Sequence, residues 1–500
     1  MKRSLLLPTR FLRPTASRHS TAALAADPNR LLSAPDTKIT TLPSGLRVAT
    51  EERHGETASV GVWIDAGSRY ETAENNGAAH FLEHLAFKGT KRRTQQGLEV
   101  EIENMGAHLN AYTSREQTVY FAKCFKQDVG KAMDVLSDIL LHSELAGGSV
   151  ERERGVIVRE MEEVSRQHEE VIMDYLHEAA YSTSGLGMTI LGPEQNINSL
   201  KQHQFRAYID THYTAPRMVI CGVGAVDHDE LVELSKTYWD KDLPSVPRTS
   251  YPTNFDPAVF GAGEVRDNKG YPDLEVAHVS VAFEGTSWTA PNASALMVVQ
   301  AMLGTWDRLS GAGARVPSLL AQQLAEKDLC HSFNTLNISY KDTGLFGIYL
   351  IGEEETMPAA LEVVAQNVKR LATPGAVSEA ELNRAKTQLK ASLMQQLNTF
   401  SFVAEDIGRQ VLTYGRRMPP VETFARIDAV TLADVTDTSN RFVKDSATES
   451  NSSSNSSTGA VCSEGGGSSL RRQQGSLALA ALGKIGKLPD YAWVDGLFVK

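Results

Sequence analysis

Residues 77–87 read GAAHFLEHLAF, an apolar stretch that contains two histidines and one glutamate in the order H-x-x-E-H. On a helix, residues four positions apart lie on one face, one turn from each other. His80 and His84 can therefore bind a single metal ion, with Glu83 beside it. No other local stretch of the chain is as informative about chemistry.

This pentapeptide also has a structural explanation. Short motifs arise by chance in long chains, and one histidine on an apolar helix is more often a hydrogen-bonded core residue than a ligand. Burying two histidines and a glutamate without partners is costly, however, which favours a metal site. H-x-x-E-H is the inverted zinc-peptidase motif, in which the histidines bind zinc and the glutamate is the general base.

The histidine stretch belongs to a pattern of strands and helices that occurs twice, about 220 residues apart. In the first half, the predicted elements are strands 58–64, 109–112, 118–122 and 218–222 and helices 128–141 and 150–164. In the second half, they are strands 275–283, 330–340, 344–350 and 477–483 and helices 294–303, 357–371 and 378–397. We therefore predict an α+β fold of two homologous α/β domains, each with a mostly antiparallel sheet packed against helices and joined by a linker.

The repeat places the chemistry in one half. The counterpart of the histidine helix, at 294–303, contains no metal ligand, so we expect a catalytic zinc-binding domain at 36–242 and a second domain without ligands at 258–500. The proline-rich stretch 243–257 is the expected linker. Residues 446–475 are rich in Ser and Gly, which predicts a disordered surface insertion.

Composition and the first residues suggest the compartment. Residues 1–26 carry five Lys and Arg residues and no acidic residue, which predicts a mitochondrial transit peptide and a flexible N-terminus at 1–35. The chain has no apolar run long enough to predict a transmembrane segment. Its four cysteines are scattered, which favours a reducing compartment, and its net charge of −11 disfavours binding to nucleic acid.

A catalytic zinc ion needs a third protein ligand. The charged helix at 150–164 is the best source, because Glu153 and Glu160 lie seven residues apart on one face. One can bind the metal while the other supports it from behind. Spacing alone does not decide between them, and a solvated acidic face laced with arginines remains the alternative.

The motifs together resemble the pitrilysin-type inverted zinc peptidases, and within them the catalytic subunits of the heterodimeric enzymes that process mitochondrial precursors. The resemblance rests on the stretches 67–77, 80–90, 110–117 and 151–164, and it extends from about residue 36 to Tyr491 apart from the Ser/Gly-rich insertion. It implies one zinc ion per chain, bound by His80, His84 and Glu160, with Glu83 as general base and Glu153 as a supporting catalytic carboxylate.

The same resemblance implies how substrate is recognised. Glu170 and Asp174, on the helix expected to continue from the ligand, match positions that bind an arginine of the presequence. Phe87 matches a position that lines the pocket for the residue after the cut. The strand with Asn110 and Tyr112 matches the edge to which an extended substrate adds. Ordinary core packing is the alternative explanation for Phe87 and Tyr112.

The resemblance further implies a heterodimer with an alpha-type subunit, precursor proteins as substrates, and a place in the mitochondrial matrix, free or at the inner membrane. It leaves a second function open, that of a core structural subunit of ubiquinol–cytochrome c reductase, with or without retained processing activity, because such subunits share fold and ancestry. The alpha-type subunit itself is disfavoured, because it lacks H-x-x-E-H and has a longer glycine-rich loop than residues 304–313. Single-chain relatives carry about four such domains, and this chain has room for two.

Overall fold

A computed structural model describes residues 35–241, 243, 257–310, 316–443, 469–472 and 475–499. The predicted transit peptide, nearly all of the predicted linker and most of the Ser/Gly-rich insertion lie outside these residues. The described chain forms two compact units, which are treated separately below. The first comprises the described parts of Met1–Met161, Thr189–Phe255 and Leu393–Glu422, and the second those of Glu162–Met188, Asp256–Ser392 and Thr423–Lys500.

Each unit thus takes one segment from the opposite half of the sequence. Residues 393–422 belong to the first unit, and residues 162–188 belong to the second. The compact units differ from the sequence ranges 36–242 and 258–500 at these two segments. The predicted boundaries, with a linker at 243–257, stay a prediction.

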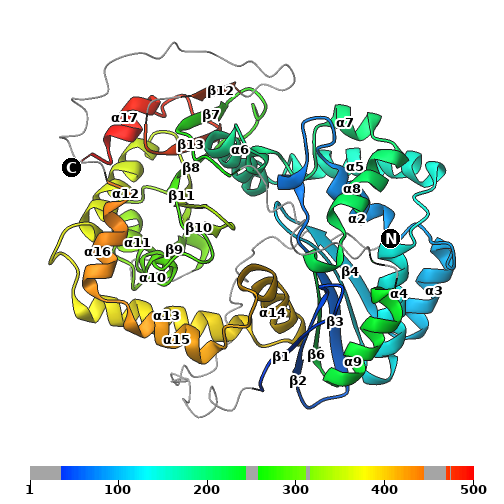
Figure 1. Ribbon diagram of the computed structural model, residues 1–500. Coiled ribbons are helices and arrows are strands. Elements are labelled where there is room, and N and C mark those ends of the chain that lie inside the picture. Colours follow the sequence, from blue (N-terminus) through cyan, green and yellow to red (C-terminus); the bar gives the residue numbers. More distant parts are fainter. Residues whose placement is uncertain are drawn as a thin grey trace. The chain divides into compact units, whose positions relative to one another are not determined.

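The first unit is a six-stranded sheet in the order β1-β2-β6-β3-β5-β4, flanked by helices (Figure 1). Only the β2–β6 pair is parallel. The strands are β1 (Lys38–Thr41), β2 (Arg47–Glu52), β3 (Thr57–Ile64), β4 (His108–Thr113), β5 (Thr118–Phe125) and β6 (Met218–Gly224). The helices are α2 (Ala78–Leu85), α3 (Gln95–Asn104), α4 (Val129–Leu141), α5 (Gly147–Val164), α7 (Glu194–Ser199), α8 (Gln202–His212), α9 (His228–Ser235) and α14 (Phe400–Tyr414).

The two faces of this sheet are covered by different parts of the chain. One face packs in the large core that includes Phe81 of α2, Met133 of α4 and Phe205 of α8. The other face carries Trp63 and Val219 and is covered by α14. A helix from the second half of the sequence therefore completes the unit that contains the histidine motif.

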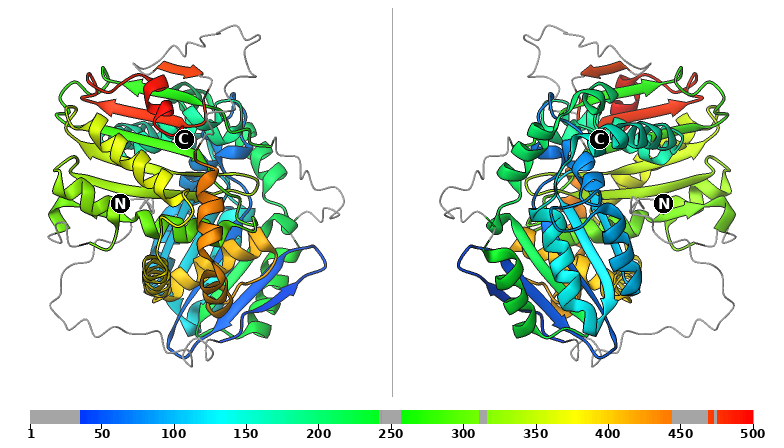
Figure 2. Two further views of the ribbon diagram at one scale, coloured as in Figure 1. Left: turned by 90° about the vertical axis from the view of Figure 1, so that its left-hand side faces the viewer. Right: turned by 90° about the vertical axis from the view of Figure 1, so that its right-hand side faces the viewer.

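The second unit is a seven-stranded sheet in the order β12-β7-β13-β8-β11-β10-β9. Figure 2 shows β12 and β13, from the end of the chain, beside β7 and β8. The strands are β7 (Gly263–Asp267), β8 (Ala277–Glu284), β9 (Thr305–Asp307), β10 (Ser332–Ser339), β11 (Gly344–Gly352), β12 (Ser469–Arg472) and β13 (Ala478–Gly483). The helices are α6 (His168–Tyr181), α10 (Ala293–Leu303), α11 (Leu319–Glu326), α12 (Met357–Leu371), α13 (Glu379–Gln396), α15 (Pro420–Ala429), α16 (Leu432–Asn440) and α17 (Tyr491–Gly496).

The two sheets repeat one topology, which confirms the predicted fold class. The order β2-β6-β3-β5-β4 corresponds to β7-β13-β8-β11-β10, and each series contains one parallel pair, β2–β6 or β7–β13. Every predicted strand and helix of the repeat is present, with ends shifted by a few residues. The sheets differ at one edge, because β9 pairs with β10 at Ser332–Asn334 and no described strand pairs with the outer edge of β4.

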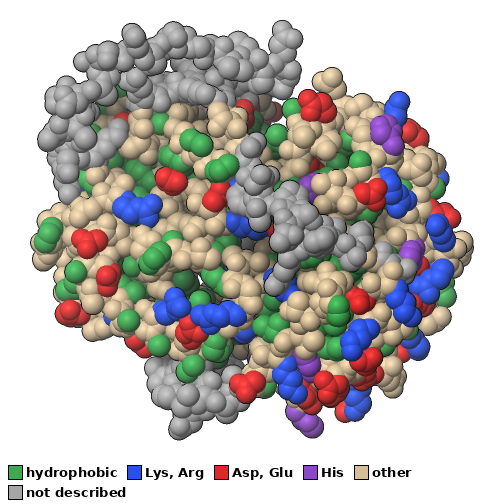
Figure 3. All heavy atoms as spheres, viewed as in Figure 1, with side chains coloured by type: hydrophobic (Ala, Val, Ile, Leu, Met, Phe, Trp, Pro, Cys, Tyr) green, Lys and Arg blue, Asp and Glu red, His purple; other side chains and the backbone are tan. Residues whose placement is uncertain are grey.

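One expectation about the helices is wrong. The segment with Glu170 and Asp174 does not continue the ligand helix, because α5 ends at Val164 and α6 begins at His168. The α6 helix instead packs on β13, β7 and β8 of the second unit. Within the described ranges, none of the helices combines the length and apolar character needed to cross a bilayer. On the face seen in Figure 3, basic and acidic side chains are interspersed over the coloured surface.

Candidate metal centre

Helix α2, which carries the H-x-x-E-H motif, begins at a glycine turn. A buried glutamate accepts hydrogen bonds from the backbone of this turn. Gly77 has φ of 99°, a conformation that favours glycine, and it precedes Ala78 as the N-cap. The backbone N–H groups of Gly77 and Ala79 donate to the carboxylate of Glu71 at 2.9 and 2.6 Å. Burial raises the pKa of Glu71 to about 7, against the lowering effect of these hydrogen bonds. The sequence analysis missed Glu71, and no local signal distinguishes it from Glu74, which lies nearer to the Asn-Gly pair.

Three predicted ligands come together at one point. Oε2 of Glu160, on α5, lies 3.1 Å from Nε2 of His84 and 3.7 Å from Nε2 of His80. One ligand atom from each of these residues lies within 4.8 Å of the other two. In the part of the chain that the structure describes, this is the one cluster of three or more such groups. The structure groups Glu160, and not Glu153, with the two histidines, a question that spacing left open.

The surroundings of these side chains fit a divalent metal. Both ring nitrogens of His80 are buried without a hydrogen-bond partner among the described residues, and Nε2 of His84 is buried facing the carboxylate of Glu160. Burial, and then the neighbouring His84, lower the pKa of His80 to about 3, so this ring is neutral and its lone pair is free for a metal. Two imidazoles and one carboxylate form a ligand set typical of catalytic zinc.

Glu83 lies on the same helix and is 5% exposed. Burial raises its pKa to about 7, and Thr113 at the end of β4 offsets part of that rise. A carboxylate with a pKa near neutrality is well suited to accept and return a proton. Tyr120 and Tyr213 lie close enough that the charge of Glu83 raises the pKa of both phenols, although burial contributes more.

Glu153 lies behind His84 and outside the cluster of His80, His84 and Glu160. Its Oε2 is 3.4 Å from Nδ1 of His84, and its Oε1 is 2.9 Å from Nζ of Lys88. Burial alone would raise the pKa of Glu153, but His84 and Lys88 hold it below its usual value. Burial would lower the pKa of His84, yet Glu153 and Glu160 raise it to about 9. The arrangement is that of a carboxylate that orients a metal-binding histidine.

The predicted substrate residues near α2 fall into two groups. Phe87 is half-buried, packs on the core shared with α2, and its ring lies 6.2 Å from that of Tyr120. Asn110 and Tyr112 lie on β4, the edge strand, which contacts α2. Their side chains alternate with Ala111, which belongs to the α2 side of the sheet. The hydroxyl of Tyr112 donates to Oε1 of Glu405 on α14 at 2.6 Å, so this side chain packs on the opposite face.

Glu170 and Asp174 lie on α6 in the second unit, both partly exposed and one turn apart. Glu178 follows after one more turn. Burial, and then the charge of Asp174, raise the pKa of Glu178. Carboxylates at 170, 174 and 178 therefore follow one side of this helix.

The second unit has no counterpart to the metal cluster among its described residues. Its α10 occupies the place of α2 in the repeat, with Leu296, Val299 and Leu303 buried and no His, Asp or Glu.

Comparisons with known proteins identify the family. Residues 47–194 match the family described as Insulinase (Peptidase family M16), and residues 199–389 match the Peptidase M16 inactive domain. The fold and the site are those of a metallopeptidase. The chain belongs to peptidase family M16.

The individual relatives have names that are more specific than the family description. The chain is 46% identical over 469 residues to the probable mitochondrial-processing peptidase subunit beta of Arabidopsis thaliana, which covers 94% of this chain and 82% of the relative. It is 49% identical to the mitochondrial-processing peptidase subunit beta of Blastocladiella emersonii, over 87% of this chain and 93% of the relative. The Rattus norvegicus protein of the same name is 45% identical, over 93% and 88%.

A solved structure shares the fold. A chain from "Complex III2 from Candida albicans, Inz-5 bound" superposes with a TM-score of 0.75 and 24% identity, over 93% of this chain and 100% of that chain. At this identity the likeness concerns the fold alone.

Proposed function

We propose that this chain is the catalytic subunit of a zinc metalloendopeptidase that removes arginine-containing presequences from proteins imported into the mitochondrial matrix. The observation that carries the proposal is the complete set of His80, His84, Glu160 and Glu83 at one point of the first unit. Relatives at 45–49% identity named as mitochondrial-processing peptidase beta subunits support the substrate class. A purely structural role in the respiratory complex gives no reason for an intact ligand set, and it is not favoured.

The residues of the chain divide the chemical work. His80, His84 and Glu160 would hold the zinc ion, which when bound supplies a Lewis acid that polarises the scissile carbonyl and acidifies water. Glu83 accepts a proton from the attacking water and passes it to the leaving amine nitrogen. Glu153 accepts a hydrogen bond from Nδ1–H of His84, so that Nε2 keeps its lone pair for the metal. No covalent bond to the enzyme is required.

The open edge of β4 supplies a place for an extended peptide. This strand contacts α2, and its outer edge has no strand partner among the described residues. Backbone hydrogen bonds to an added strand give binding that is independent of side chains, which suits presequences of varied sequence. Because Tyr112 is bound to Glu405, we assign its role to support of this strand and not to direct contact with substrate.

The partner subunit is the first testable part of the proposal. We expect the purified mature chain to cleave an arginine-containing presequence peptide poorly, and an added alpha-type subunit to restore cleavage at one site. The rate should fall to background when a chelator removes the metal and return with zinc. Full activity of the chain alone would contradict the heterodimer, and activity that survives the chelator would contradict the metal mechanism.

Arginine recognition is the second testable part. Glu170→Gln and Asp174→Asn should each lower kcat/KM for an arginine-containing peptide about tenfold, because each removes one charge-assisted hydrogen bond to a guanidinium. The neighbouring Glu169 is exposed, and Glu169→Gln serves as the matched control. The loss should disappear for a peptide in which alanine replaces the arginine. Equal losses on both peptides would assign these carboxylates to α6 stability instead.

A further inference from the structure

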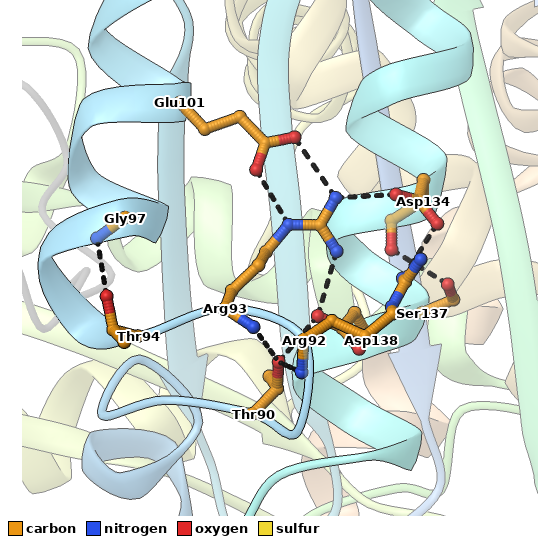
Figure 4. Close-up of polar contacts among 9 residues, drawn as sticks. All are labelled: Thr90, Arg92, Arg93, Thr94, Gly97, Glu101, Asp134, Ser137 and Asp138. Carbon is orange, nitrogen blue, oxygen red and sulfur yellow. Dashed lines mark hydrogen bonds and ion pairs between the residues drawn. The ribbon is translucent and has the colours of Figure 1, made fainter.

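The segment that leaves α2, residues 86–94, is anchored by the charged network of Figure 4. Arg93 donates to both carboxylate oxygens of Glu101 on α3, at 2.7 and 3.0 Å. It also donates to Oδ2 of Asp138 on α4 at 2.8 Å, and Asp138 has a fully buried side chain. The hydroxyl of Thr90 donates to the same oxygen at 2.7 Å. Bidentate and charge-assisted contacts of this kind fix geometry as well as energy.

Backbone contacts hold the part of this segment nearest to α2. The N–H of Lys88 donates to the carbonyl of Leu85 at 3.0 Å, and the carbonyl of Gly89 accepts from Glu144 at 3.2 Å. Gly89 has φ of 118°, a conformation that other residues rarely adopt. Lys88 therefore starts from a fixed backbone position immediately after α2.

The side chain of Lys88 reaches toward the metal ligands and not into solvent. Its Nζ lies 2.9 Å from Oε1 of Glu153, and the two side chains are 18% and 7% exposed. The other oxygen of Glu153 faces Nδ1 of His84 at 3.4 Å. Lysine, carboxylate and imidazole thus form a chain of contacts that ends at Nε2 of His84, the atom that faces Glu160 at 3.1 Å.

We propose that Lys88 is a positioning residue for the metal site: it holds Glu153 in the orientation that fixes the ring of His84. This inference rests on the zinc site of the proposed function and assigns a role to a residue outside the ligand set. A nearly buried carboxylate that loses one of two partners is free to turn away from the other. The orienting carboxylate would then no longer hold the ring.

The direction in which zinc affinity changes when Lys88 is replaced distinguishes a positioning role from simple electrostatic repulsion. A lysine close to a metal site repels the cation, so loss of its charge alone would tighten zinc binding. Loss of an orienting contact would weaken zinc binding, because partners behind a ligand typically contribute 10–100-fold to metal affinity. The two explanations therefore predict opposite changes for one substitution.

The test is the zinc affinity of the purified full chain, measured by competition with a chromophoric chelator. Lys88→Met should weaken zinc binding about tenfold, the lower end of the range for such partners. Lys88→Arg, which keeps the charge and the reach, should restore most of the affinity. Lys91→Met, at an exposed lysine three residues on, should change nothing.

A double substitution tests whether Lys88 acts through Glu153. In a Glu153→Gln background, Lys88→Met should cause no further loss, because the coupled contact is already gone. Thermal unfolding of the metal-free proteins shows whether each variant is folded, and Lys88→Gln provides a second neutral side chain if Lys88→Met is not. Unchanged or tighter zinc binding in a folded neutral variant would overturn the proposal, as would equal losses with and without Glu153.

The measurement needs neither substrate nor partner subunit. A chain that binds zinc with the expected Lys88 dependence but does not cut presequences would refute the proposed function and leave this inference standing. Normal cleavage with a zinc affinity insensitive to Lys88 would do the reverse.

Discussion

Glu83→Gln is expected to abolish presequence cleavage while zinc stays bound. Glutamine has nearly the size of glutamate but cannot take a proton from the attacking water, and a positioned general base contributes about 10²–10⁴-fold to rate. His80, His84 and Glu160 are unchanged in this variant, so the metal content should remain one zinc ion per chain. The measurement is kcat of the variant with the alpha-type subunit, together with zinc analysis of the same sample.

A second glutamate gives the matched control. Glu163 is exposed at the end of α5, and Glu163→Gln removes the same charge from the chain without touching the site. Its kcat should equal that of the wild type. If zinc-loaded Glu83→Gln retained turnover within tenfold of wild type, another group would have to accept the proton, and the assignment of Glu83 would be wrong.

Gly408→Ala is expected to destabilise the first unit strongly. A Cβ at this position in α14 would lie 2.2 Å from Cδ2 of Trp63, whose ring is buried on the sheet. The neighbouring atoms belong to a rigid indole ring, so α14 must move away from the sheet. Overpacking of this kind typically lowers the free energy of unfolding by about 1–3 kcal/mol, occasionally more. Urea unfolding of the purified chain, followed through tryptophan fluorescence, measures the loss.

Another helical glycine provides the comparison. Gly155 is exposed within α5, and the nearest atom to a Cβ there is Nη1 of Arg159 at 3.9 Å. Gly155→Ala should stabilise the protein by about 1 kcal/mol, because alanine is the better helix former. The same chemical change thus has opposite signs at the two sites. Equal effects would mean that α14 does not pack closely on Trp63 in solution.

The repeated arrangement of strands and helices was predictable because each element has its own local pattern of apolar residues. Strand 58–64 alternates, helix 357–371 has a clear apolar face, and both are found where predicted, at Thr57–Ile64 and Met357–Leu371. The metal motif was predictable for the same reason, since four residues of one helix determine that His80 and His84 share a face. Local periodicity carries this information without knowledge of what lies opposite.

The packing of the helices on the sheets could not be predicted, because the periodicity of a segment does not show which surface it contacts. An apolar face on α14 or α6 does not show which sheet it covers, so the exchange of these helices was not predicted. The direction of Tyr112 follows from that exchange, because Glu405 lies on α14. Spacing alone did not separate Glu153 from Glu160 either, because the two approach different nitrogens of His84 and only coordinates show which.

The placement of α14 also bears on how the chain folds. The hydrogen bond from Trp63 to Glu405 joins residues 342 positions apart, and contacts of such separation make folding slow. A chain that enters a compartment N-terminus first completes β1 to β6 long before α14 is present. Until then, Trp63, Val119 and Val219 form an uncovered apolar sheet face, which is prone to aggregation. We therefore expect the first unit to complete its folding only after residues 400–414 have become available to cover this face.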